Sequence, residues 1–133
     1  GGLLNLPVET DEIWVEMDNR PLAGLPFDVA EARYPRPKFR NPYEPFHGVG
    51  ESDWALHCRA VSAVEKTIRR GPGQYLVVSH GGILNAVLRS IVGAQPPING
   101  QGVWFAFGDA GYIRCSYNPK AHHWLILELR PGE

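Results

Sequence analysis

The clearest pattern in the chain is a stripe of apolar residues after Ser52, a residue type that often caps a helix N-terminus. Its members recur at steps of three and four residues, which is the spacing of one helical face. They are Trp54, Cys58, Val61, Val64 and Ile68. Arg69, Arg70 and Gly71 follow, as is typical of a helix C-terminus. The pattern predicts an amphipathic helix with this stripe as its buried face.

Residues 75–93 predict a strand that runs directly into a second helix. Tyr75 to Val78 is an apolar run with two β-branched residues, and after Gly81 and Gly82 apolar residues recur at helical spacing. His80 therefore stands beside the free N–H groups and the positive dipole end of a helix. Such an imidazole can help to bind phosphate, or it can be a structural hydrogen-bonding residue. These residues alone leave both interpretations open.

The remaining elements are shorter. Prolines delimit a short helix at residues 27–33, and residues 35–50 form a proline-rich loop with neither helical nor strand period. After a further Pro/Gly connection, we predict a meander of strands at 103–107, 111–117 and 123–129. Helices and strands in this order predict a mixed α/β domain with helices packed on a sheet.

Composition narrows the function classes. A chain of 133 residues with 44% hydrophobic content fits one domain, residues 1–133, with a real core. A net charge of −1 gives no electrostatic basis for binding nucleic acid or a membrane surface. Polar residues interrupt every apolar run, so we expect no membrane-spanning helix, and no signal peptide is visible. The chain begins with Gly1 rather than Met, and we expect a processed, engineered or excerpted product.

The two cysteines and five histidines do not suggest a metal site. Cys58 and Cys115 form no CxxC pair, which favours buried free thiols in a reducing, cytoplasmic compartment. His122 and His123 are adjacent, so in a strand their side chains would face opposite ways. We expect neither a metal nor a cofactor.

Three motifs, taken together and in order, resemble the histidine phosphatase superfamily, which has the phosphoglycerate-mutase-like fold. The first is Glu16 followed by Met-Asp-Asn-Arg-Pro-Leu-Ala-Gly-Leu, and the second is Gly50-Glu51-Ser52 with Arg59 eight residues after Glu51. The third is Ser-His80-Gly-Gly after a Val-Val strand. The resemblance extends from about residue 6 to residue 129. It implies a three-layer α/β/α sandwich with a mixed sheet.

The resemblance also implies roles for individual residues. His80 matches the second active-site histidine, which helps to bind the phosphoryl group and stabilises charge in the transition state. Glu16 matches the acid that protonates the leaving oxygen, although without the resemblance an ordinary surface carboxylate is the simpler interpretation. Gly81 would let a substrate approach the backbone. For Glu51, Ser52 and Arg59 we expect a mainly structural role.

The proline-rich loop is a candidate for substrate recognition. In related enzymes the corresponding excursion covers the active site and helps to choose the substrate. Here Arg36, Lys38 and Arg40 would meet phosphate or carboxylate groups. The alternative is that these basic residues only solvate the loop.

The main departure from the family is the nucleophile. In the family, the histidine of an N-terminal Arg-His-Gly becomes phosphohistidine, and this chain contains no Arg-His-Gly. Arg20-Pro21 also stands where a glycine-rich turn is common. We therefore expect a partial, truncated domain of a phosphatase or phosphomutase family that is inactive alone. Its ligand would be phosphate or a phosphorylated small molecule, and the sequence does not separate sugar phosphates, phosphoglycerates, nucleotides and phosphoproteins.

Two non-catalytic alternatives stay open. The chain is either a phosphate-binding relic or a protein-interaction and oligomerisation module on the same scaffold. In the family fold the absent first strand lies beside the strand that ends at His80, so its loss would expose sheet edges. We expect either a homo-oligomer through those edges or a rewired sheet in which residues 75–79 pair with a later strand.

Overall fold

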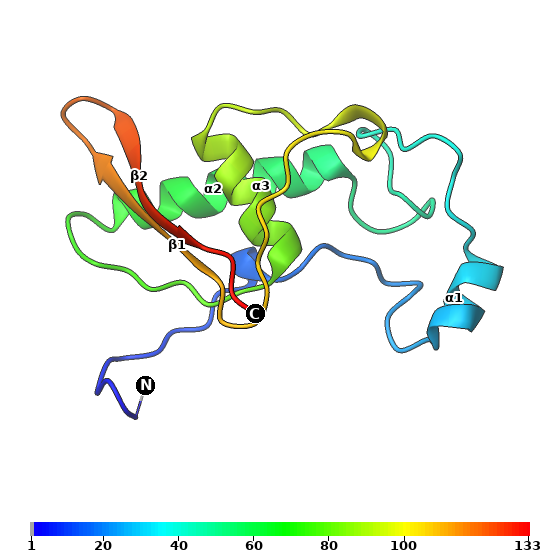
Figure 1. Ribbon diagram of the computed structural model, residues 1–133, viewed down its shortest axis with the longest axis horizontal. Coiled ribbons are helices and arrows are strands. Elements are labelled where there is room, and N and C mark those ends of the chain that lie inside the picture. The colour runs from blue at the N-terminus through cyan, green and yellow to red at the C-terminus, as the bar shows by residue number, and fades with distance from the viewer. Residues whose placement is uncertain (1) are drawn as a thin grey trace.

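The computed structural model of the protein describes residues 2–133, and its core is a pair of packed helices (Figure 1). Helix α2 spans Asp53–Arg69 and helix α3 spans Gly81–Ile91. The short 3-10 helix η1, Glu12–Trp14, lies against α2. Helix α1, Phe27–Arg33, has no buried residue and stands apart from the helix pair at the end of a long loop (Figure 1). A second 3-10 turn, η2, spans Ile98–Gly100.

Helix α2 begins as its sequence predicts, but it buries a different face. The Ser52 hydroxyl accepts a hydrogen bond from the Ala55 N–H at 3.0 Å, which confirms the N-cap. The buried residues are Leu56, Ala60 and Ala63, whereas Cys58 and Val61 are exposed. The prediction of the buried stripe was therefore wrong at these two positions. The small side chains of Ala60 and Ala63 allow α3 to approach one side of α2 closely. On the other side, no part of residues 2–133 covers Cys58 or Val61.

Helix α3 supplies most of the core. Its buried apolar residues are Ile83, Ala86, Val87 and Leu88. Two polar residues of the same helix, Asn85 and Arg89, are also buried. Burial of an amide and a guanidinium requires hydrogen-bond partners. The segment that follows η2 supplies most of these, and Asn85 Nδ2 also donates to the Gly81 carbonyl at 2.9 Å, whereas the buried Nη2 of Arg89 has no hydrogen-bond partner in the described residues.

That segment and the one before α3 were predicted as strands, and both predictions were wrong. Neither 75–79 nor 103–107 forms a ladder in the described part of the chain. A strand needs a partner backbone, and the backbone of Phe105 instead pairs with the Asn85 side chain, at 2.7 Å and 3.1 Å. The Val103 carbonyl accepts from Arg89 Nε at 3.2 Å. Residues 75–79 pair with no later strand, so the expected rewired sheet is not seen either.

The sheet in residues 2–133 is a hairpin of two antiparallel strands, as predicted for the last two strands. Strand β1 spans Tyr112–Asn118 and strand β2 spans His123–Arg130. A bulge shifts the register between Arg114 and Cys115. The fold class is thus mixed helix and strand, but two strands without further partners do not form the expected three-layer sandwich.

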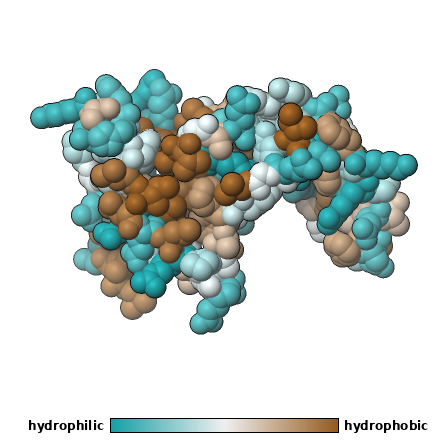
Figure 2. All heavy atoms as spheres, turned by 45° about the horizontal axis from the view of Figure 1, so that its top comes forward, coloured by the Kyte–Doolittle hydropathy of each residue, from teal (hydrophilic) through white to brown (hydrophobic). Residues whose placement is uncertain are grey.

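Much apolar surface is left uncovered. Figure 2 shows apolar side chains gathered on the surface of the main body. Among the exposed apolar residues, Leu76 and Val78 are 75% and 85% exposed. Both cysteines are free, yet only Cys115 is partly buried, and this burial raises the pKa of its thiol. The expectation of two buried thiols was wrong for Cys58, which lies on the uncovered side of α2.

Within residues 2–133, no helix is long and apolar enough to cross a membrane.

The packing of α3 on α2 leads to a prediction about the free energy of unfolding. Replacement of the fully buried Ile83 by alanine leaves a cavity, and we expect it to lower the free energy of unfolding by roughly 2–5 kcal/mol in urea titrations. The matched control is Ile98→Ala, because Ile98 is 63% exposed and its truncation should cost less than about 0.5 kcal/mol. Equal losses for the two variants would contradict the described core.

Candidate functional site

The candidate site is the N-terminus of α3, where the Glu16 carboxylate accepts three backbone hydrogen bonds. Oε2 accepts from the Gly82 N–H at 3.0 Å, and Oε1 accepts from the Ile83 N–H at 3.0 Å and the Met17 N–H at 2.8 Å. The first N–H groups of a helix have no partner within the helix and carry its positive dipole end. The Glu16 carboxylate therefore occupies backbone amides of the kind that bind anions at helix N-termini.

His80 stands at the same helix end. It is the N-cap residue of α3, and its carbonyl accepts from the Leu84 N–H at 3.1 Å. Its side chain is exposed and makes no capping hydrogen bond. The imidazole is thus open to solvent at the N-terminus of α3, and its role in phosphate binding stays a prediction.

The two glycines after His80 differ in their surroundings. A Cβ on Gly82 would lie 2.3 Å from Glu16 Oε1, so only glycine leaves room for the carboxylate in its present position. A Cβ on Gly81 would meet nothing within 4 Å. The open side of Gly81 is compatible with the expected approach of a substrate.

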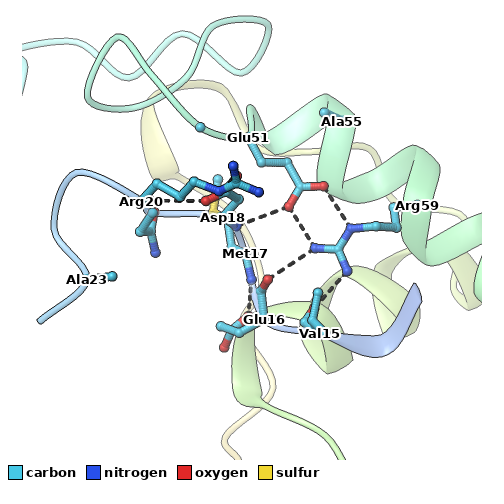
Figure 3. A pocket seen from close by; sticks show the side chains of 11 residues that line it. Val15, Glu16, Met17, Asp18, Arg20, Ala23, Glu51, Ala55 and Arg59 are labelled. Atoms are coloured by element: carbon cyan, nitrogen blue, oxygen red, sulfur yellow. Dashed lines mark hydrogen bonds and ion pairs between the residues drawn. The ribbon is translucent and has the colours of Figure 1, made fainter. Parts of the chain in front are cut away.

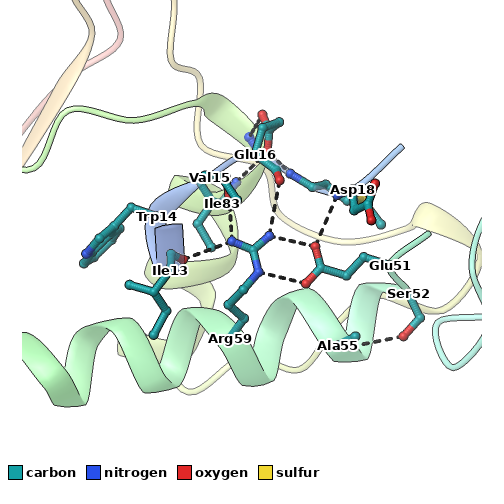
Figure 4. A network of polar contacts seen from close by, with 12 residues as sticks. Ile13, Trp14, Val15, Glu16, Asp18, Glu51, Ser52, Ala55, Arg59 and Ile83 are labelled. Atoms are coloured by element: carbon teal, nitrogen blue, oxygen red, sulfur yellow. Dashed lines mark hydrogen bonds and ion pairs between the residues drawn. The ribbon is translucent and has the colours of Figure 1, made fainter. Parts of the chain in front are cut away.

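Arg59 on α2 holds the segment that carries Glu16 (Figure 4). Its Nε and Nη2 donate to the two carboxylate oxygens of Glu51, at 2.8 Å and 2.7 Å. Nη1 donates to the carbonyl oxygens of Ile13 and Val15, at 3.0 Å and 2.7 Å, and Nη2 also donates to the Glu16 carbonyl at 3.3 Å. The hydrogen bonds to Glu51 raise the pKa of Arg59 above its ordinary value. The guanidinium stays charged and fully engaged.

Glu51 also forms hydrogen bonds to the backbone of the segment that carries Glu16, at Asp18. Its N–H donates to the Asp18 carbonyl at 3.0 Å, and its carboxylate accepts from the Asp18 N–H at 3.3 Å. Gly50 makes this approach possible, since its φ is +92° and a Cβ would lie 2.2 Å from the Asp18 carbonyl oxygen. Glu16, Glu51 and Arg59 line a hollow of about 660 Å³ (Figure 3). His80 does not line this hollow.

The basic residues of the proline-rich loop lie elsewhere. Arg40 is already paired: its Nε donates to Asp53 at 2.8 Å, and its guanidinium stacks 4.6 Å from the centroid of the Phe46 ring. Arg36 and Lys38 are exposed, and neither lines the hollow beside Glu16. The structure therefore brings together His80, Gly81 and Glu16, but not the three loop residues.

Sequence reasoning missed the polar pair of α3. Asn85 and Arg89 hold the segment 103–107 on the helix, and Arg89 also lies 4.2 Å from the centroid of the Trp104 ring. The signal was present, because two polar residues four positions apart interrupt an otherwise apolar helical face. Their backbone partners lie 20 and 14 residues away, and that separation could not be read from local spacing. In the described residues, no group of three or more His, Cys, Asp or Glu could hold a metal ion.

The family is established by comparison with known proteins. The model of the histidine phosphatase superfamily (branch 1) matches residues 1–125. The match covers most of the 133 residues, and the chain belongs to this superfamily. Comparison with curated proteins and with solved structures finds no match.

The crowding at Gly82 makes a prediction about Glu16. We expect Gly82→Ala to push the carboxylate off the amides of residues 82 and 83 and to lower the free energy of unfolding by about 1–2 kcal/mol, as for lost charge-assisted hydrogen bonds. Gly81→Ala is the matched control, because its new methyl group enters open space and alanine suits a helix. Urea titration of both variants checks this, and equal stabilities would contradict it.

Proposed function

We propose that this domain binds the phosphoryl group of a phosphorylated small molecule at the N-terminus of α3. In this proposal it supplies the phosphate-binding and acid side of a histidine phosphatase site. Phosphomonoester hydrolysis or phosphoryl transfer needs a nucleophile, which in the family is the histidine of Arg-His-Gly. The sequence contains no such tripeptide, and in this proposal the chain alone does not turn over substrate.

One observation carries the proposal: the Glu16 carboxylate and His80 both lie at the N-terminus of α3. The Glu16 carboxylate already occupies two α3 amides at 3.0 Å, which supports an anion-binding geometry at this place. His80 is exposed beside it and adds a second donor for a phosphate oxygen. Membership of the superfamily makes phosphate the natural anion.

Each residue then has a distinct role. His80 binds the phosphoryl group, Gly81 lets it approach the backbone, and Glu16 takes the place of the family's acid, which gives a proton to the leaving oxygen. Arg36 and Lys38 are exposed and free to contact a distal part of the substrate. Arg40 can join them only if its pair with Asp53 opens. Two free cysteines support a reducing, cytoplasmic setting.

The proposal predicts opposite effects of two substitutions on phosphate affinity. His80→Ala removes a donor and should weaken the binding of inorganic phosphate and phenyl phosphate roughly tenfold, the equivalent of ~1.4 kcal/mol. Glu16→Gln removes a competing negative charge from the α3 amides and should strengthen binding several-fold. Isothermal titration calorimetry measures both, with the exposed His123→Ala as the control.

Turnover is measured on the same proteins with an aryl phosphate between mildly acidic and neutral pH. We expect none for the chain alone, and activity when a polypeptide that carries Arg-His-Gly is added. Turnover by the chain alone that disappears in His80→Ala would show that another residue supplies the nucleophile. Phosphate binding that is weak and indifferent to both substitutions would refute the proposed site.

A second candidate function is assembly through the uncovered segments. Residues 75–79 receive no backbone hydrogen bond in the described part of the chain, and their side chains at 76 and 78 are largely exposed. Free N–H and C=O groups beside apolar side chains form a template for another strand. A second copy of the chain can offer the same segment across a two-fold axis, which is the simplest self-complementary interface. Such pairing would give residues 75–79 the partner backbone that they lack in the described part of the chain.

Assembly is tested by sedimentation equilibrium over a range of protein concentrations. We expect a dimer, and we expect Val78→Lys to shift it to monomer without loss of monomer stability, since Val78 is 85% exposed. Val8→Lys is the matched control, because Val8 is 72% exposed but lies outside the segment. A monomer at every concentration, or equal effects of the two lysines, would refute this function.

A further inference from the structure

We infer that Arg59 is a positioning residue for Glu16 and not a ligand of the substrate. The inference rests on the proposed function, because it concerns the carboxylate at the proposed phosphate site. An arginine that lines the hollow beside Glu16 looks at first like a phosphate clamp. Its hydrogen bonds point to a different role.

Arg59 has no donor left for a ligand. A guanidinium carries five N–H groups, and Arg59 makes five hydrogen bonds to protein oxygens. Two of them go to the Glu51 carboxylate in a bidentate pair, and three go to backbone carbonyls of residues 13, 15 and 16. A phosphate could reach this guanidinium only by breaking bonds within a partly buried pair, whose side chains are 21% and 13% exposed.

The five bonds determine where the Glu16 carboxylate can be. Arg59 binds the carbonyl oxygen of Glu16, which places the backbone of that residue on α2. The side chain of the same residue reaches the α3 amides. Glu16 therefore bridges the two helices, with its backbone on one and its carboxylate on the other (Figure 4). Loss of the planar guanidinium frees the backbone, and the carboxylate then loses its alignment with both amides.

The inference separates Arg59 from Arg69, the other arginine of the same helix. Arg69 forms an exposed pair with Glu65 one turn earlier, at 3.1 Å. It contacts neither Glu16 nor Glu51 through a hydrogen bond or an ion pair in the described residues. Arg69→Lys is therefore a matched control for Arg59→Lys. In both variants the charge is kept and the five-donor fork is replaced by an ammonium with three donors.

The first readout is the amide proton resonance of Gly82 and of Ile83 in the ¹⁵N-labelled full chain. Both amides donate to a carboxylate, and we expect Arg59→Lys to move both resonances upfield, in the direction set by Glu16→Gln. Arg69→Lys should leave them unchanged. Glu51→Gln weakens the same clamp without touching Arg59, and it should give a smaller shift of the same sign. It serves as the second variant if Arg59→Lys does not fold.

The second readout is the affinity for inorganic phosphate in a double-mutant cycle. Release of Glu16 from the amides should let Arg59→Lys strengthen phosphate binding several-fold, and this effect should vanish in the Glu16→Gln background. A merely structural role predicts weaker binding in both backgrounds. A ligand role also predicts weaker binding in both. Either result, or unmoved amide resonances in folded Arg59→Lys and Glu51→Gln, overturns the inference.

The two proposals fail in distinguishable ways. If the wild-type chain and Glu16→Gln both fail to bind phosphate, the proposed function fails. The amide resonances of the free protein still report whether Arg59 positions Glu16. If phosphate binds as proposed but Arg59→Lys behaves like Arg69→Lys, only the positioning role fails.

Discussion

The bidentate pair between Arg59 and Glu51 is the interaction on which the candidate site depends. It gathers α2, the segment that begins at η1 and the Gly50 turn around one guanidinium. A half-buried charge pair stabilises little by itself, because desolvation offsets most of the attraction. Its consequence here is geometric: with every donor engaged, the Glu16 backbone has one position relative to α3. The carboxylate then reaches two helix amides that are otherwise unpaired.

The rest of the described fold is less constrained. The core consists largely of two helices with small or branched side chains at their contact, and the hairpin β1–β2 has no further strand beside it. Apolar residues on the outer side of α2 and in segment 75–79 remain in contact with water.

Local signals predicted much of the fold. Helices α1, α2 and α3 and the final hairpin were all expected within about a residue, because caps, turn residues and periodicity act over a few positions. The motifs also placed Glu16 and His80 at one site, and the structure brings both to the N-terminus of α3. Segment 75–79 was wrongly predicted as a strand. An apolar β-branched run forms a strand only when another backbone lies beside it.

By itself, the sequence determined the three helices, the final hairpin and the family. Tertiary structure alone decided which face of α2 is buried, that Asn85 satisfies the backbone of Phe105, and that Arg40 pairs with Asp53. It also decided that all five donors of Arg59 are used within the protein. The physical reason is the separation along the chain over which each interaction acts. Caps and periodicity act between neighbours in the chain, whereas burial and polar pairing depend on groups that only folding brings together.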